Sequence, residues 1–273
     1  MPLRVQQPTS SSLRYLTVRL LQVPRTTSTT TILTTSSSSP LSSPFRHPRL
    51  PPSPQPLSKR HFSNTANKMT SSSTFFDAVK ARRTIYQLSA ESTIPDSKIK
   101  EIVEQAVLHV PSSFNSQSTR VVVLLGPDHQ KLWGDIVKPA VKAVAPAEAW
   151  PSSEQRLSGF QAGYGSVLFY EDPKVVAGLQ EKFPLYADRF PQWSEHTNAM
   201  HQFAIWTALE QEGLGANLQH YNPLIDDKIS ATWNVPATWS LKAQLVFGKP
   251  TGGPADKAFG PLEERVFIHG AKN

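Results

Sequence analysis

The sequence predicts a layered domain of the α/β or α+β class, in which helices pack on a sheet. Four apolar runs between residues 119 and 247 have the β-branched composition and the length of buried strands. About seven stretches in which apolar residues recur at three- and four-residue steps precede and separate these runs. Because helices and strands must each bury an apolar face, this mixture folds as layers around a common core.

The elements can be placed in order along the chain. A first helix is expected from Thr74 to Arg83, with Ser73 or Thr74 as its cap. A second helix begins near Asp96, carries an apolar stripe and ends at Pro111. The remaining elements are expected as strands at 119–126, 166–170, 216–221 and 241–247 and as helices at 130–144, 173–183, 193–212 and 225–233.

Two segments in the second half of the chain bear on assembly. The helix at 193–212 has few charges after His196, so it is expected to be buried on more than one side. It would be a central core helix in a monomer and could equally form the interface of a dimer. The segment at 261–269 (PLEERVFIH) is too short to fold alone. It must dock on another surface, for which a partner subunit is one candidate.

Charge is distributed unevenly between the N-terminal part and the rest of the chain. Residues 1–76 contain nine of the 28 Lys and Arg residues and none of the 21 acidic ones. The 19 basic residues that remain from Asp77 onward leave that part at about −2, whereas the whole chain carries +7. A nucleic-acid binder needs a basic face on its folded module, so this distribution argues against nucleic acid as a partner.

An acid-free N-terminus rich in Arg and Ser is typical of an organelle transit peptide. Residues 1–72 are therefore expected to be a disordered transit peptide and linker, followed by one domain at 73–273. The segment at 60–63 (RHFS) resembles the processing site of mitochondrial presequences and places cleavage near Phe62. The alternative is a disordered tail without any address. Met69 offers an internal start for a cytosolic form.

Two absences narrow the possible functions further. No run of about 18 apolar residues occurs, so no membrane-spanning helix is expected. The chain has no Cys, which excludes disulfides, thiolate nucleophiles and Cys-ligated iron–sulfur clusters. Any redox activity must therefore depend on a bound cofactor.

Three short segments carry candidate chemistry, and the first is the motif at 82–86 (RRTIY). It places two guanidinium groups and a hydroxyl at the end of a short helix. Such a cluster can grip and neutralise a phosphate. Adjacent arginines at the C-terminus of a helix can also simply offset the helix dipole on a solvated surface.

The second segment, at 111–118 (PSSFNSQS), offers hydroxyls and two carboxamides on a loop before a strand. Carboxamides can read the edge of a flat heterocycle, because each presents a donor and an acceptor. An ordinary polar loop that satisfies its own backbone fits equally well. The third segment, at 213–223 (GLGANLQHYNP), has two glycines that allow close approach of the backbone to a ring. Gly213 alone also fits the cap of the preceding helix.

In their order and context these segments resemble the nitroreductase family, and most closely its fungal and bacterial branch of fatty-acid-repression-mutant type proteins. The resemblance extends over nearly all of residues 75–266. It implies an α+β fold with α/β/α layers, in which a central and mostly antiparallel sheet is flanked by helices. It further implies a homodimer with an extended C-terminal arm, FMN as the cofactor and NAD(P)H as the reductant.

The resemblance also assigns roles to individual residues. In the family the first motif binds the flavin phosphate and the pyrimidine side of the ring. The loop reaches the flavin from the other subunit, and the third segment lies near the reactive edge of the ring. The cofactor-binding residues implied in this way are Arg82, Arg83, Thr84, Tyr86, Ser112, Ser113, Asn115, Gln117, Gln219, His220, Tyr221 and the phosphate-binding Lys257.

The sequence departs from the family pattern at two positions. Tyr86 stands where many relatives have a basic residue, and Phe259 stands where many have an arginine two positions after the lysine. Two lost positive charges could weaken the hold on the phosphate or select a different reductant.

The leading hypothesis is an FMN-dependent NAD(P)H oxidoreductase that reduces nitroaromatics, quinones or similar flat electron acceptors by ping-pong hydride transfer through flavin N5. The cofactor performs the difficult step, so no catalytic side chain is assigned. No metal site is expected either, because His196 and His201 are five residues apart and do not share a helical face. The alternatives are a non-catalytic flavin-binding redox sensor linked to lipid metabolism or oxidative stress, and a scaffold with a vestigial pocket.

Overall fold

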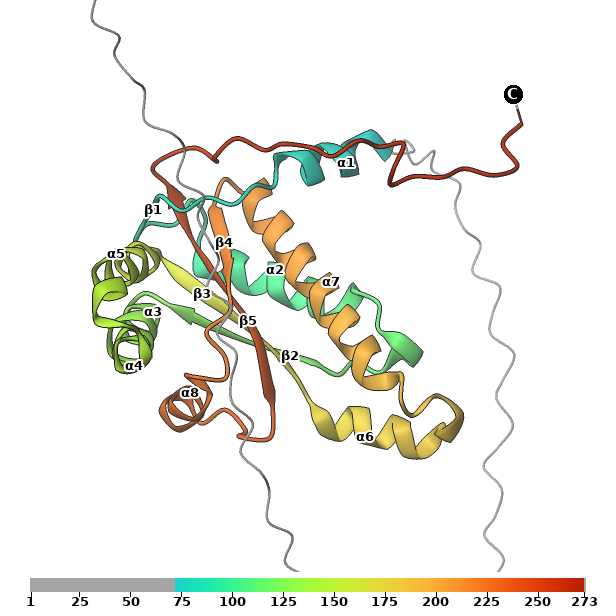
Figure 1. Ribbon diagram of the computed structural model, residues 1–273, viewed down its shortest axis with the longest axis horizontal. Helices are drawn as coiled ribbons and strands as arrows, with labels where there is room; N and C mark the ends of the chain where they lie inside the picture. The colour runs from blue at the N-terminus through green and yellow to red at the C-terminus, as the bar shows by residue number, and fades with distance from the viewer. Residues whose placement is uncertain (1–71, 273) are drawn as a thin grey trace, which may run out of the picture. The chain divides into compact units, whose positions relative to one another are not determined.

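Five strands form one sheet in which all paired strands run antiparallel (Figure 1). The structure, a computed structural model, describes residues 72–272, which all belong to the second of two units in the chain, Asn64–Asn273. The predicted transit peptide, its processing site near Phe62 and Met69 lie outside the described residues. The strands are β1 Leu88–Ser89, β2 Thr119–Leu125, β3 Gly165–Glu171, β4 Gly215–Gln219 and β5 Ser240–Pro250.

The longest strand, β5, organises the sheet. It pairs with β1, β3 and β4, and β2 extends the sheet beyond β3. The register of β4 runs from Gly215 opposite Gly248 to Gln219 opposite Gln244. Every residue of β3 is buried, as expected for a strand covered on both faces. The mostly antiparallel sheet implied by the family resemblance is thus confirmed.

Helices cover both faces of the sheet. Short 3-10 turns occur as well, including η1 (Ser113–Asn115), and a π-helical segment, η2 (Leu132–Val137), joins α3 to α4. The α-helices are α1 Ser72–Ala81, α2 Asp96–His109, α3 Pro127–Lys131, α4 Lys138–Val144, α5 Trp150–Gln161, α6 Pro173–Lys182, α7 Phe190–Gln211 and α8 Asp226–Trp233.

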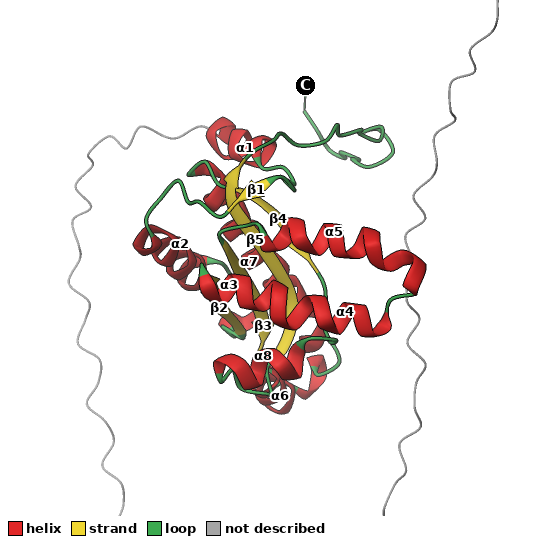
Figure 2. Cartoon of the chain, turned by 90° about the vertical axis from the view of Figure 1, so that its left-hand side faces the viewer, coloured by secondary structure: helices red, strands yellow, loops and turns green. Residues whose placement is uncertain are grey.

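Two hydrophobic cores lie on opposite faces of the sheet, because successive side chains of a strand point to opposite sides. On β3, Leu168 packs against η2, α5 and α8, whereas Val167 and Phe169 pack against α2 and α7. Figure 2 shows α4 and α5 in front of the sheet and α7 behind it. This arrangement confirms the predicted α/β/α layering.

The long helix α7 and the arm after β5 position the residues considered below. Helix α7 begins at Phe190, three residues before the predicted start, and ends before Gly213, whose φ of 81° confirms it as the predicted cap. Residues 251–272 form neither helix nor strand, and Figure 1 shows them running past α1. Within the part of the chain that is described, no helix combines the length and apolar character needed to cross a membrane.

Candidate cofactor site

Arg82 follows α1 and lies against the C-terminal half of α7. Its guanidinium carbon is 4.4 Å from the centroid of the Trp206 ring, a cation–π contact. The Nε of Arg82 is buried and has no hydrogen-bond partner among the described residues. A buried donor on a charged group is costly to leave unpaired, so this position is suited to a bound anion or acceptor.

Arg83 uses its side chain differently from Arg82. Its guanidinium donates to the carbonyl oxygen of Ala255 in the C-terminal arm, and its backbone N–H donates to Glu210 Oε2 at 2.7 Å. The indole of Trp206 donates to the other oxygen of Glu210 at 2.8 Å. Burial raises the pKa of Glu210, although these hydrogen bonds and the charge of Arg82 act in the opposite direction. Glu210 therefore holds both the backbone of the motif and the ring beneath Arg82.

The first and third segments meet beside β4. Thr84 forms a parallel bridge with Ala216, and the N–H of Ile85 donates to the Ala216 carbonyl at 2.9 Å. Asn217 Nδ2 donates to the Ile85 carbonyl at 2.9 Å. A Cβ added at Gly215 would lie 3.0 Å from the Ile85 side chain, so the glycine allows the motif to approach the strand closely. The structure thus joins segments that are more than a hundred residues apart in sequence.

Four aromatic rings, which we call the aromatic wall, lie where these two segments diverge. They belong to Tyr86, Trp133, Phe160 and Tyr221. The Phe160 ring centroid is 6.4 Å from that of Tyr86 and 6.4 Å from that of Tyr221, and Trp133 lies 5.6 Å from Tyr221. Burial raises the pKa of Tyr221, with Arg156 opposing the shift and Tyr86 adding to it, which places these groups near one another.

The other two residues predicted at the reactive edge are next to Tyr221 in sequence. Gln219 donates through Nε2 to Asn217 Oδ1 at 2.9 Å, and the backbone N–H of Tyr221 donates to Gln244 Oε1 at 2.8 Å. The side chain of His220 is exposed. Asn217 of β4 and Gln244 of β5 therefore fix this segment and leave His220 accessible.

The loop at 112–118 has an unusual backbone. Phe114, Asn115 and Gln117 have φ angles of 55°, 51° and 50°. Each such left-handed residue other than glycine costs about 1–2 kcal/mol, so the loop conformation depends on its contacts. Ser112 Oγ accepts a hydrogen bond from the backbone N–H of Gln117 at 3.0 Å, and Ser113 begins η1.

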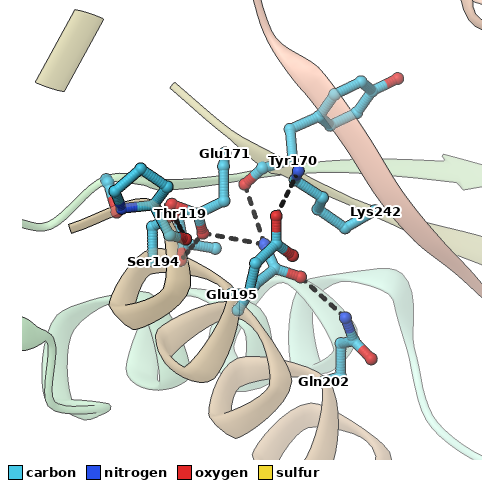
Figure 3. A network of polar contacts seen from close by, with 10 residues as sticks. Thr119, Tyr170, Glu171, Ser194, Glu195, Gln202 and Lys242 are labelled. Atoms are coloured by element: carbon cyan, nitrogen blue, oxygen red, sulfur yellow. Dashed lines mark hydrogen bonds and ion pairs between the residues drawn. The ribbon is translucent and has the colours of Figure 1, made fainter. Parts of the chain in front are cut away.

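A buried carboxylate holds the end of this loop. Glu171, the last residue of β3, accepts hydrogen bonds from Ser118 Oγ at 2.5 Å and from Thr119 Oγ1 at 2.6 Å. Asn198 of α7 donates to it at 2.9 Å, and Gln202 donates to Asn198 at 2.7 Å, as Figure 3 shows. The network links the loop, the sheet and the first half of α7.

Within one chain the loop and the arginine motif lie at different ends of α7. The Phe114 ring centroid is 5.4 Å from that of Phe190 and 6.0 Å from that of Trp193, near the start of the helix. Arg82 stacks on Trp206 near its end. At 1.5 Å per residue, Trp193 and Trp206 are about 20 Å apart along the axis. The first and third segments therefore converge in one chain, and the loop does not join them.

The loop borders an open groove of about 740 Å³ on the surface of α2. Ser112, Asn115 and Gln117 line it together with Val107 and Leu108 of α2, which are exposed. An apolar face next to polar loop side chains is a common feature of protein interaction sites.

Lys257 lies in the arm, with its Nζ 5.2 Å from the Phe259 ring centroid. The hydrogen bond from Arg83 to Ala255 brings the start of the arm to the arginine motif. Beyond it the apolar side chains are exposed, including Phe259 at 78% and Ile268 at 76%.

The buried histidines have structural partners. His129 Nδ1 is 2.9 Å from Ser166 Oγ and its Nε2 is 3.0 Å from the Phe160 carbonyl, and burial lowers its pKa to about 4. His201 Nδ1 is 2.9 Å from the Thr197 carbonyl. Residues 72–272 contain no cluster of His, Asp or Glu side chains able to hold a metal ion.

These features define a layered α+β protein with a partly buried arginine motif and a polar loop at opposite ends of one helix. Its sequence matches the nitroreductase family over residues 79–249. The chain belongs to this family.

Two curated relatives from Saccharomyces cerevisiae carry the name nitroreductase. HBN1 is 37% identical over 204 residues, which cover 73% of this chain and 100% of HBN1. FRM2 is 37% identical over 193 residues, which cover 70% of this chain and 95% of FRM2. FRM2 is of the fatty-acid-repression-mutant type that the sequence resembles.

Solved structures share the fold. Nitroreductase CinD from Lactococcus lactis, in complex with 4-nitrophenol, is 42% identical with a TM-score of 0.66, covering 71% of this chain and 99% of CinD. A nitroreductase-type protein from Desulfovibrio desulfuricans in complex with FMN is 17% identical with a TM-score of 0.51, covering 71% of this chain and 95% of that one, which shows the fold alone.

Proposed function

We propose that this chain is an FMN-dependent NAD(P)H oxidoreductase that reduces nitroaromatics, quinones or similar flat electron acceptors. Family membership supports the oxidoreductase class. The observation that carries the cofactor assignment is the buried, unpartnered Nε of Arg82, on a guanidinium stacked over Trp206. A charged donor in this position fits an anionic cofactor that brings its own acceptors.

Different residues of the chain would bind different parts of the cofactor. Arg82 would hold the phosphate or the pyrimidine edge of the flavin, and Lys257 would add positive charge to the phosphate. Bound FMN would supply the redox chemistry, taking reducing equivalents from NAD(P)H in one half-reaction and passing them to the acceptor in the other, in a ping-pong cycle. The aromatic wall supports a flat acceptor, since its exposed edge at Tyr86 can stack on a ring.

We further propose that the working unit is a homodimer. The loop packs through Phe114 on Trp193, and Arg82 packs on Trp206 about 20 Å further along α7, so a second copy is needed to bring the loop to the arginine motif. The exposed apolar side chains of the arm and of α2 support the same conclusion, because monomeric proteins rarely expose large apolar patches.

The experiment that tests the function is an absorption spectrum of the purified protein before and after anaerobic addition of NAD(P)H. Bands of oxidised flavin that bleach with NAD(P)H are expected, and a quinone or nitroaromatic should then restore them. Protein that stays colourless after incubation with FMN would contradict the proposal.

A second candidate function is a flavin-binding redox sensor. It is favoured by Tyr86 and Phe259, which stand where many relatives carry positive charge and which are both exposed. In that case the flavin would bind but NAD(P)H would not bleach it at the rates of an enzyme.

For the compartment we propose a mitochondrial form produced by cleavage near Phe62, with Met69 as the start of a cytosolic form. The acid-free composition of residues 1–76 supports this. N-terminal sequencing of the protein purified from a mitochondrial fraction should find an end close to Ser63, and an intact Met1 there would contradict it.

A further inference from the structure

A small polar pocket lies between the end of β3, α8 and the loop before β5. Its volume is about 260 Å³. Residues from the end of β3, from α8 and from the loop before β5 line it, among them Tyr170, Asp226, Asp227 and Trp239. In Figure 3 the Tyr170 ring extends away from the Glu171 network. None of the residues expected to bind the flavin lines this pocket, although Pro223, at the end of the third segment, does.

Two polar atoms at this pocket lack partners. Tyr170 is only 4% exposed, and its hydroxyl has no hydrogen-bond partner among the described residues. Asp226 Oδ1 is buried and lacks one as well. Native proteins pair nearly all such groups, since an unpaired buried polar group costs about 1–3 kcal/mol. Tyr170 and Asp226 line the same cavity, and the charge of Asp226 acts on the Tyr170 hydroxyl, so one group bound between them can satisfy both.

The charges around the pocket indicate what that group is. Asp226 and Asp227 form no ion pair among residues 72–272, whereas the nearby Lys242 pairs with Glu195 at 2.5 Å. Burial raises the pKa of Asp226, and the charge of Asp227 adds to this effect against that of Lys242. The pocket thus has uncompensated negative charge, and its wall includes the ring of Trp239, which already holds the Arg120 guanidinium 5.7 Å from its centroid.

The Tyr170 hydroxyl sets a second requirement for the chemistry of the bound group. Burial and the neighbouring charge of Asp226 raise the pKa of its hydroxyl, so it remains a hydrogen-bond donor at neutral pH. A ligand that satisfies both orphaned atoms must carry a donor for the carboxylate and an acceptor for the hydroxyl. At about 260 Å³ the cavity is below the usual range for drug-sized ligands, which excludes a nucleotide.

We propose that the Tyr170–Asp226 pocket binds a small aliphatic amino alcohol, with the ammonium group donating to Asp226 and the hydroxyl oxygen accepting from Tyr170. This site does not depend on the flavin. It assigns a ligand to two side chains that the proposed oxidoreductase reaction does not use.

Isothermal titration calorimetry of the full chain with three matched probes tests the proposal. Ethanolamine carries both groups, ethylammonium lacks the hydroxyl and ethylene glycol lacks the charge. One lost neutral hydrogen bond should make ethylammonium bind about threefold to tenfold more weakly than ethanolamine, and the loss of the charge should cost tenfold or more. Equal binding of the three probes, or binding of none, would leave ordered water as the occupant and overturn the proposal.

Variants assign the contacts within the pocket. Asp226→Asn should weaken ethanolamine binding about tenfold or more, and Tyr170→Phe should abolish the preference for ethanolamine over ethylammonium. Asp188→Asn and Tyr186→Phe remove the same groups at exposed positions outside the pocket and should bind as the parent does. Tyr170→Phe removes an unpaired buried hydroxyl, so it should fold with undiminished stability. If it instead loses stability and keeps the preference, the hydroxyl has a structural partner and the proposal is wrong.

Discussion

At the scale of the single residue, Arg82 shows how packing can prepare a charged side chain for a ligand. One face of its guanidinium lies on Trp206, whose indole is held by Glu210. The side chain is therefore oriented before anything binds, and its Nε is left without a partner. Orientation of this kind reduces the entropy lost on binding.

Arg82→Ala should therefore weaken FMN binding tenfold or more, because a hydrogen bond from a charged group is worth about 1.5–3 kcal/mol. Fluorescence quenching during titration with FMN measures this. Arg189→Ala, which removes an exposed arginine that pairs with Asp188, is the matched control and should bind normally. Equal affinity of the two variants would show that the phosphate lies elsewhere.

His129 makes a residue-scale prediction about pH. The chain of donors from Trp133 through Ser166 to His129 Nδ1, and from Nε2 to the Phe160 carbonyl, fits the neutral ring. Burial lowers the pKa of His129 from 6.5 to about 4, so between these values the unfolded chain binds a proton that the folded chain does not. Stability is then complete above pH 6.5 and falls as the pH decreases toward 4, by roughly 3 kcal/mol in total.

Urea unfolding at pH 5 and pH 7 measures this effect. His129→Gln retains a donor and an acceptor without a titrating group, so its stability should depend less on pH than that of the parent. His109→Gln, at an exposed position of α2, should leave the dependence unchanged. A parent protein equally stable at both pH values would show that His129 does not titrate in this way.

At the scale of the element, Glu171 explains how a strained loop is kept in place. Its carboxylate joins the start of β2 to α7 through Ser118, Thr119 and Asn198 (Figure 3). Three short contacts at the end of the loop offset the cost of three left-handed residues within it. The end of the loop is thus fixed from the core, whereas exposed hydrogen bonds from Gln117 to Ser112 and from Arg120 to Gln117 hold its interior.

Glu171→Leu should lower the free energy of unfolding by roughly 3 kcal/mol or more, because it leaves the buried hydroxyls of Ser118 and Thr119 without an acceptor and removes one of the two acceptors of Asn198. Urea unfolding followed by circular dichroism measures the change. Glu195→Leu removes the half-exposed carboxylate paired with Lys242 and should cost less than about 1 kcal/mol. Similar losses for the two variants would mean that the buried network contributes little.

Elements that depend on local pattern could be predicted from the sequence. The four expected strands all occur, because continuous apolar runs such as 166–170 are buried on both faces. Helix α5 was not predicted, since only Leu157 and Phe160 of its residues are buried and the rest show little periodicity. Strand β1 has two residues and depends on its pairing with β5.

In the candidate site, too, some residues could be predicted from the sequence and others could not. The motif at 82–86 and the segment at 213–223 stood out in the sequence, their cofactor roles were implied by the family resemblance, and the structure brings the two segments together. Trp206, Glu210 and Arg156 were missed, because they reach these segments only through packing of α7 and α5. Nothing in their local sequence distinguishes them from other helical residues. The side chain of Arg83, which is predicted to bind the cofactor, donates to the Ala255 carbonyl of the arm, a contact that residue types do not predict.

At the scale of the whole molecule, the arrangement of α7 makes the dimer testable without a structure of it. In the proposed homodimer each site combines Arg82 of one subunit with the loop of the other. An Arg82→Ala subunit and an Asn115→Ala/Gln117→Ala subunit each form homodimers with two defective sites. A mixed dimer has one site with both defects and one site that is intact.

Co-expression of the two variants with different affinity tags should therefore restore FMN binding that neither variant shows alone. Random pairing of subunits restores about a quarter of all sites, and dimers isolated through both tags carry one intact site in two. If Arg82 and the loop served the same site within one chain, every site in the mixture would keep a single defect and nothing would be restored. Flavin content per subunit, read from absorbance, separates these outcomes, and its value in the doubly tagged fraction decides whether the site is shared between subunits.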